Sequence, residues 1–175
     1  MMDEPAERLA SGEPAAFIAL YDATADRLRH YLVAMLGASA DADDVLQETF
    51  LRLARDRRRL TEIDDPIAFA FAVARNEARR WLDSRRRRSA TTAAARDLFV
   101  EADSDDPSAR EAAEDAALAL AALSISDREI VELKLFAGLT FREIAAIVGR
   151  PLGTVASRHQ AALGRMRDVL SRRER

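Results

Sequence analysis

Residues 140–165, TFREIAAIVGRPLGTVASRHQAALGR, decide the fold of the C-terminal part of this chain. Ala145 is followed after four residues by Gly149, and Gly149 is followed after six residues by the aliphatic Val155. In a helix-turn-helix, a small residue lets two helices approach, a glycine makes the turn, and an aliphatic residue anchors the second helix. The spacing therefore predicts a helix-turn-helix, which usually places its second helix in the major groove of DNA.

The second helix of this unit is predicted to have one apolar face and one polar face. Its inward positions carry apolar side chains: Val155, Ala162, Leu163 and Met166. Its outward positions carry hydroxyl groups, an alanine and arginines, with no acid: Thr154, Ser157, Arg158, Ala161 and Arg165. Such a face suits phosphate oxygens and base edges. An ordinary helical hairpin also uses glycine turns and apolar stripes, and it is the alternative to a DNA-binding unit.

The composition favours helices and argues against catalysis. Hydrophobic residues make up 49% of the 175 residues, alanine is abundant, and glycine and proline are few. The chain has no cysteine, and its two histidines, His30 and His159, stand in no metal-ligand or nucleophile motif. We therefore expect no catalytic residue, no metal and no cofactor, and we do not expect an enzyme.

The sequence carries no signal for export or for membrane insertion. The N-terminus, MMDEPAERLASGEP, is acidic and polar, unlike a signal peptide. No apolar run in the sequence is long enough to span a bilayer. We therefore expect a cytoplasmic protein.

The net charge of −3 hides an uneven distribution of charge. Residues 75–88 contain seven arginines and two acids, and residues 150–175 also contain seven arginines and two acids. Between these basic blocks, residues 97–115 contain eight acids and one arginine. Guanidinium groups suit phosphate binding, so each basic block is a candidate surface for nucleic acid.

Helical periodicity and end signals predict three helices in the N-terminal half. Apolar repeats predict helices over about 14–36 and 42–57. Asp65 as N-cap and Pro66 as first helical residue predict the start of a third helix, which runs out into the arginines at 85–88. The segment RRRLTEIDDP, 57–66, is expected to be a loop.

Three further helices are expected in the C-terminal half, ahead of the DNA-facing one. The alanine-rich segment 107–123 favours a helix. Ser126 and Glu129 stand at the spacing of a capping box for the next helix, and Thr140 and Glu143 do so for the first helix of the helix-turn-helix.

The sequence therefore predicts an all-α fold, with no internal repeat and no convincing strand. Two small helical domains, 1–88 and 111–175, are joined by a flexible acidic linker over 89–110. The C-terminal domain contains the helix-turn-helix, and each domain carries its own basic surface.

Four segments, taken in order, make the chain resemble a bacterial RNA polymerase sigma factor. The resemblance is to the extracytoplasmic-function group, which keeps only the second and fourth conserved regions. ASGEPAAFIALYDATADRLRHYL (10–32) resembles the opening of region two, and DADDVLQETFLRL (41–53) resembles the helix that docks on the clamp helices of the polymerase beta-prime subunit. VARNEARRWLDSRRRR (73–88) resembles the helix that meets the promoter minus-10 element, and residues 123–167 resemble region four, which recognises the minus-35 element.

The resemblance covers nearly the whole chain and implies an alternative sigma factor. Such a protein binds core polymerase, at the beta-prime clamp helices and the beta subunit, and directs promoter recognition and duplex melting, while polymerase performs the chemistry. The residues matched to polymerase binding are Asp43, Asp44, Gln47 and Glu48. The family often has an anti-sigma protein, which is a further candidate partner beside core polymerase and promoter DNA.

The match and the helical faces together indicate two sets of DNA-binding residues. The first set would lie against minus-10 DNA: Arg75, Asn76, Arg79 and Arg80. The second set would approach the minus-35 major groove and its phosphates: Arg150, Thr154, Ser157, Arg158 and Arg165. The segment 57–66 would lie where the family captures a flipped base, whose unstacking costs roughly a few kcal/mol.

Several positions depart from the family pattern. Phe69 stands where many members have Trp, Arg80 where many have Asp, and Ala156 where many have Lys. Ala156 removes one candidate contact to phosphate or base, so the minus-35 preference is expected to differ. His159 replaces a common apolar residue and is expected to be packed or half-buried rather than a ligand.

Two other classes of protein would explain parts of the sequence. A helix-turn-helix transcriptional regulator that does not bind core polymerase as a sigma factor, such as a response-regulator output domain, would explain residues 126–145. That class does not require residues 41–88. A helical adaptor that does not bind DNA is the third class, and it would show no salt-dependent DNA binding.

Overall fold

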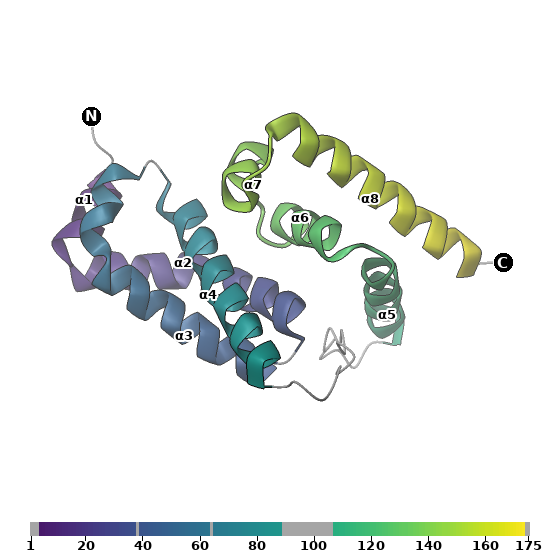
Figure 1. The fold of residues 1–175 in the computed structure, drawn as a ribbon, viewed down its shortest axis with the longest axis horizontal. Coiled ribbons are helices and arrows are strands. Elements are labelled where there is room, and N and C mark those ends of the chain that lie inside the picture. The colour runs from purple at the N-terminus through teal and green to yellow at the C-terminus, as the bar shows by residue number, and fades with distance from the viewer. Residues whose placement is uncertain (1–3, 38, 64, 89–106, 174–175) are drawn as a thin grey trace. The chain divides into compact units, whose positions relative to one another are not determined.

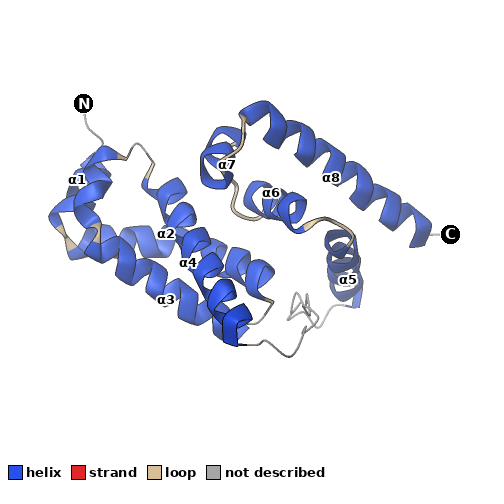
Figure 2. Ribbon diagram, in the orientation of Figure 1, coloured by secondary structure: helices blue, strands red, loops and turns tan. Residues whose placement is uncertain are grey.

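The computed structural model describes residues 4–37, 39–63, 65–88 and 107–173. These residues form α-helices and one 3-10 helix, and no strand occurs among them (Figure 2). The chain divides into two compact units, residues 1–95 and 96–175. The predicted all-α fold is therefore confirmed over the described ranges, and none of the helices in these ranges is long and apolar enough to cross a membrane.

The N-terminal unit is built around three long helices. Its elements, in chain order, are α1 (Glu4–Ser11), α2 (Pro14–Leu36), α3 (Ser39–Arg55), the 3-10 helix η1 (Arg57–Glu62) and α4 (Pro66–Arg88) (Figure 1). Helices α2, α3 and α4 pack on one another, and α1 packs against η1 and α2. The rings of Tyr31 and Phe71, both fully buried, meet edge to face with their centroids 5.8 Å apart. This contact joins α2 to α4 in the core.

Two helices of this unit have the predicted bounds because strong signals fix their ends. Pro14 begins α2, and Gly37 ends it in the left-handed conformation with a φ of 78°. Asp65 caps α4, because its Oδ1 accepts hydrogen bonds from the N–H groups of Ile67 and Ala68 at 2.9 and 3.0 Å. The N-cap predicted for α4 is therefore confirmed.

Three features of this unit differ from the prediction. Periodicity does not predict α1, residues 57–62 form η1 rather than a loop, and α3 covers Ser39–Arg55 rather than 42–57. Short elements depend on packing more than on propensity. Leu9 of α1 and Leu60 of η1 are both buried, so these two elements are held by tertiary contacts that a local pattern does not report.

The C-terminal unit is built around its last helix. Its elements are α5 (Pro107–Ala121), α6 (Ile125–Leu135), α7 (Phe141–Val148) and α8 (Leu152–Arg173), and α8 packs against the other three (Figure 1). Leu120, Leu123, Val131 and Ala162 form its core cluster, with Met166 packed against them. Helix α5 begins inside the range 89–110 that was expected to be the linker, and the rest of that range, 89–106, lies outside the described residues.

The predicted helix-turn-helix forms from α7 and α8. The Thr140 hydroxyl accepts a hydrogen bond from the Glu143 N–H while the Glu143 carboxylate accepts one from the Thr140 N–H, so the capping box is confirmed. Gly149 ends α7 in the left-handed conformation, with a φ of 67°, which is less favourable for residues that carry a Cβ. Val155 is fully buried at the start of α8, as predicted.

The start of α6 differs from the prediction. Its N-cap is Ser124, whose Oγ accepts a hydrogen bond from the Asp127 N–H at 3.2 Å. Ser126, the predicted cap, instead accepts a hydrogen bond from Arg158 of α8 at 2.6 Å. The hydroxyl at 126 is therefore used between helices, and the helix begins two residues earlier than a cap at Ser126 would place it.

Candidate functional site

The first turns of α8 present an exposed polar face beside the turn of the helix-turn-helix. Thr154 and Ser157 are exposed, and the Ser157 hydroxyl donates to the Thr154 carbonyl at 3.1 Å. Arg150 is exposed in the turn, where its backbone N–H donates to the Ala145 carbonyl at 3.1 Å. Three of the five residues predicted to meet minus-35 DNA therefore stand in solvent near the N-terminus of α8.

The other two predicted residues, Arg158 and Arg165, are held by an acid on a neighbouring helix. Arg158 Nε donates to Asp127 Oδ1 at 2.7 Å, and Arg165 Nη2 donates to Asp127 Oδ2 at 2.7 Å. The Asp127 side chain is 10% exposed, whereas the arginine side chains are 31% and 48% exposed. The two guanidinium groups therefore lie at the edge of the exposed face and form ion pairs within the chain.

The inner side of α8 carries a histidine among apolar contacts. His159 is 8% exposed, and its ring meets the Phe141 ring edge to face, with centroids 5.2 Å apart. Burial lowers the pKa of His159, and the nearby Lys134 ammonium lowers it further. His159 Nε2 is buried without a hydrogen-bond partner in the described structure. The expectation that His159 is a packed residue is confirmed.

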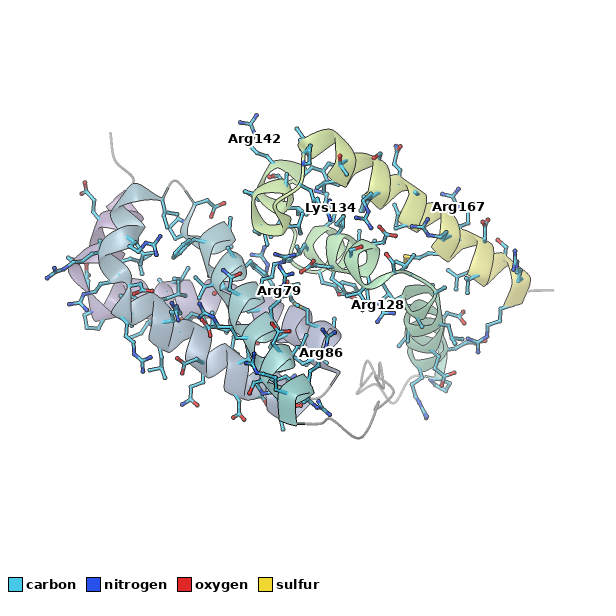
Figure 3. The ribbon with its side chains drawn as sticks, viewed as in Figure 1. Arg79, Arg86, Arg128, Lys134, Arg142 and Arg167 are labelled. Carbon is cyan, nitrogen blue, oxygen red and sulfur yellow. The ribbon has the colours of Figure 1, made fainter. Side chains whose placement is uncertain are left out.

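Further exposed polar residues surround the same unit. Gln160 is exposed three residues after Ser157 on α8. Arg142 extends away from α7, and Arg167 lies further along α8 (Figure 3). Sequence reasoning did not name these three, although the helical spacing from Ser157 was a signal that could have found Gln160.

The basic helix α4 places most of its predicted residues in solvent. Asn76, Arg79 and Arg80 are exposed, whereas Arg75 is half-buried. Figure 3 shows Arg79 and Arg86 on α4, both exposed. These side chains give α4 a cationic surface, which favours contact with a phosphate backbone.

Arg80, one of the residues that departs from the family pattern, has a partner in the core. Arg80 Nη1 lies 2.7 Å from Oε1 of Glu77, a carboxylate that is 10% exposed. Arg52 of α3 also reaches this oxygen, with Nη1 at 3.4 Å. A buried carboxylate needs such pairing. Arg52 links Glu77 of α4 to α3, whereas Arg80 pairs with Glu77 within α4 and also belongs to the basic surface.

The four residues predicted to bind polymerase lie on α3, away from its buried face. Asp44 and Gln47 are exposed, and within the described part of the chain their side chains form no ion pair or hydrogen bond. Asp43 pairs with Arg29 at 2.8 Å and Glu48 pairs with Arg55 at 3.2 Å, both at the surface. Sequence reasoning missed Leu51, which is 45% exposed on the same side of α3. This face therefore combines acids with one aliphatic side chain.

The described residues contain no group of three or more potential metal ligands among His, Cys, Asp and Glu. The candidate sites are three exposed surfaces: an acidic face on α3, a basic face on α4 and a polar face at the start of α8.

Comparison with known proteins assigns both units. Residues 20–88 match the family model described as Sigma-70 region 2, and residues 113–166 match the model described as Sigma-70, region 4. The chain is 33% identical to the ECF RNA polymerase sigma factor SigL of Mycobacterium tuberculosis over 166 residues, which cover 92% of each protein. The chain belongs to the extracytoplasmic-function (ECF) RNA polymerase sigma factors. Its predicted family and its function as an alternative sigma factor are thus confirmed.

Two further relatives resemble this ECF sigma factor. It is 34% identical to the ECF RNA polymerase sigma factor BldN of Streptomyces coelicolor over 158 residues, which span 88% of the present chain but only 60% of BldN. Its fold is similar to a chain in the co-crystal structure of the sigma factor RpoE with the anti-sigma factor NepR from Bartonella quintana. That match has a TM-score of 0.69 and 22% identity, and it covers 90% of this chain and 95% of the other.

The family determines the general role of the protein. Sigma factors are non-catalytic transcription initiation factors that bind core RNA polymerase and promoter DNA. A helix-turn-helix regulator outside the sigma factors is not favoured, because region two accounts for residues 20–88.

Proposed function

We propose that this sigma factor uses three separate surfaces to bring core RNA polymerase to a promoter. Residues 1–88 act as the region-two domain and residues 111–175 as the region-four domain, with 89–110 as the tether between them. The proposal rests on the order of the two family matches, each of which falls on a compact unit with an exposed basic or polar face. The protein would act in the cytoplasm, where polymerase is.

The acidic face of α3 is the proposed contact with the beta-prime clamp helices. Asp43, Asp44, Gln47 and Glu48 supply acceptors for basic side chains, and Leu51 supplies an apolar contact among them. An exposed aliphatic residue inside a polar rim is typical of a protein interface. Region four would contact the beta subunit, so that polymerase holds both domains.

Reversal of charge at Asp44 tests the α3 contact. Because Asp44 is exposed, Asp44→Arg should keep the fold yet weaken core binding at least about tenfold through like-charge repulsion. Asp26→Arg, which makes the same change at an exposed position on α2, is the matched control. Co-purification and titration with core polymerase measure the effect. Equal binding by both variants would remove α3 from the interface.

The exposed face of α4 is the proposed contact with minus-10 DNA. Asn76 and Arg79 stand in solvent and can reach phosphate or base edges, while Arg75 and Arg80 lie at the borders of the face. The segment 57–66, most of it η1, would receive a flipped base of the non-template strand, and protein contacts must offset an unstacking cost of roughly a few kcal/mol.

The start of α8 is the proposed contact with minus-35 DNA. Arg150, Thr154 and Ser157 would approach the major groove directly. Arg158 and Arg165 would contribute guanidinium donors that their ion pairs leave available. Phosphate contacts set the position of the helix, and base contacts select the sequence.

An anti-sigma protein is the proposed inhibitor. The RpoE structure named above contains such a partner, NepR. A partner of this kind would compete with core polymerase for the same sigma factor. Addition of the purified inhibitor should therefore displace the wild-type protein from core polymerase and stop initiation, and simultaneous binding of both would contradict direct competition.

A further inference from the structure

The carboxylate of Asp127 joins the start of α6 to two positions on α8. Its Oδ1 accepts a hydrogen bond from Arg158 Nε, and its Oδ2 accepts hydrogen bonds from Arg165 Nη2 and from the Ser124 hydroxyl, at 2.7, 2.7 and 2.8 Å. Arg158 also donates from Nη2 to the Ser126 hydroxyl at 2.6 Å. One acid at the start of α6 thus fixes two arginines that lie seven residues apart on α8.

The acid is charged in this environment. Burial would raise the pKa of Asp127, but hydrogen bonds from Ser124 and Arg158 and the charges of Arg158 and Arg165 outweigh burial, and the pKa lies below its ordinary value. The cluster of two guanidinium groups and one carboxylate keeps one net positive charge. It can therefore still attract a phosphate.

The geometry leaves donors for a ligand. A guanidinium group has five N–H donors, and the contacts above use two of them on Arg158 and one on Arg165. Both side chains remain partly exposed, at 31% and 48%. A long arginine side chain that is already fixed loses less conformational entropy when it binds a target than a free one does.

We propose that Asp127, assisted by Ser126, is a positioning residue for minus-35 recognition, which holds the guanidinium groups of Arg158 and Arg165 at a fixed place beside the exposed start of α8. The proposal rests on the proposed minus-35 contact of α8 and deepens it. Asp127 itself does not touch DNA; it acts through the two arginines.

Two other roles for Asp127 would change DNA binding differently in the Asp127→Asn variant, and the experiment distinguishes them from positioning. If Asp127 only neutralised positive charge, Asp127→Asn would strengthen binding to every DNA fragment alike. If Asp127 only held the fold, Asp127→Asn would unfold the C-terminal unit, and the free variant would lose helical circular dichroism together with its discrimination between sequences. Positioning predicts a third result, in which discrimination between sequences falls while the helical circular dichroism of the free protein and its general DNA binding are kept.

The experiment uses the holoenzyme formed with core polymerase and two DNA probes. The first probe is a promoter fragment that the wild-type holoenzyme selects from a randomised library, and the second is the same fragment with its minus-35 block scrambled. The ratio of the two affinities, measured at several salt concentrations, is the readout. Asp127→Asn should lower this ratio about tenfold, the size expected for one misplaced charge-assisted contact, while binding to the scrambled probe stays within about twofold.

Two further variants make the result specific. Asp115→Asn makes the same charge change at another acid that pairs with α8, through Arg173 in its last turn, and it should leave the ratio unchanged. Asp127→Glu, which keeps the charge, should restore most of the discrimination. An equal effect of Asp127→Asn on both probes, or no effect, would overturn the proposal.

Ser126→Ala covers the case in which Asp127→Asn does not fold. Ser126 is exposed, so its loss removes one tether on Arg158 without a change of charge. This variant should lower the affinity ratio about twofold to threefold, and an unchanged ratio would then overturn the proposal. A wild-type holoenzyme that does not distinguish the two probes would instead contradict the minus-35 contact of α8 itself.

Discussion

At the scale of single residues, two buried acids on α6 have pKa values shifted in opposite directions, because one has close hydrogen-bond partners and the other, within the described residues, does not. Asp127 accepts hydrogen bonds from two arginines and a serine, and its pKa is lowered despite burial. Glu132, five residues later and 6% exposed, has its pKa raised to about 7 by burial, with the Arg128 charge offsetting part of that effect. The first acid favours the folded state when charged, and the second favours it when protonated.

Glu132 therefore predicts a pH dependence of stability. The pKa of Glu132 in the folded protein lies above the ordinary 4.5. Protonated Glu132 therefore stabilises the folded state fully below about pH 4.5, and this stabilisation is lost as the pH rises through about 7. Glu132→Gln should raise the unfolding free energy of the C-terminal unit at pH 8, by roughly 3 kcal/mol at most, with little change at pH 4.5. Thermal unfolding followed by circular dichroism measures this, and an identical pH profile in both proteins would contradict it.

Substitution of Arg150 is expected to change the salt dependence of DNA binding. Its side chain is exposed in the turn before α8, so Arg150→Ala should leave the fold intact. Loss of one phosphate contact should lower the slope of log affinity against log salt by about one. Arg110→Ala, at an exposed position on α5, serves as the control with the same loss of charge. A slope that falls equally in both variants would place no specific contact at Arg150.

Long-range pairs are the part of the site that sequence reasoning could not reach. Periodicity predicted Arg158 and Arg165 on the outer side of α8, and both are partly exposed there. Their partner Asp127 lies 31 and 38 residues earlier, and no local pattern links positions at that separation. Phe71 is a similar case, because its full burial depends on contact with Tyr31 on another helix, far away in the sequence.

At the scale of helices, end signals decided how well the sequence predicted each element. Helices α2 and α4 have the predicted bounds because prolines, a capping acid and a glycine mark their ends. The turn between α7 and α8 was predictable for the same reason. Elements without such signals, namely α1 and η1, were missed. The start of α6 was shifted because its cap is Ser124, while the Ser126 hydroxyl accepts a hydrogen bond from Arg158. The positions of these elements depend on contacts with other helices.

The contact between α1 and η1 gives a test at this scale. Gly12, which follows α1, has a φ of 81°, and a Cβ there would meet Arg57 Nε at 2.9 Å. Gly12→Ala should lower the stability of the N-terminal unit by about 1–2 kcal/mol, because the left-handed conformation strains residues that have a Cβ. Urea unfolding followed by fluorescence of Trp81, the single tryptophan, measures the loss.

The Arg57→Ala background separates backbone strain from crowding. If strain dominates, Gly12→Ala should cost the same in both backgrounds, since the Arg57 side chain is flexible and can move. If Gly12→Ala causes no loss of stability in the Arg57→Ala background, the loss seen with Arg57 present comes from crowding against that side chain. No cost in either background would contradict the left-handed conformation at Gly12.

At the scale of the whole molecule, the distribution of charge matters more than its sum. The net charge of −3 would not suggest a DNA-binding protein, yet the chain has two basic blocks that fall in different compact units. The family matches fall on the same two parts of the chain. A promoter contains two separated elements, and two independent helical units on one chain are suited to bind both when polymerase sets their spacing.

Run-off transcription with purified core polymerase on a library of randomised promoters tests this account most directly. The account predicts that addition of this protein starts transcripts at defined sites and that the active templates share two sequence blocks, at the minus-10 and minus-35 positions. Initiation should be lost with Asp44→Arg and kept with Asp26→Arg. Absence of initiation on every template, under conditions where the folded protein and core polymerase are both present, would contradict it.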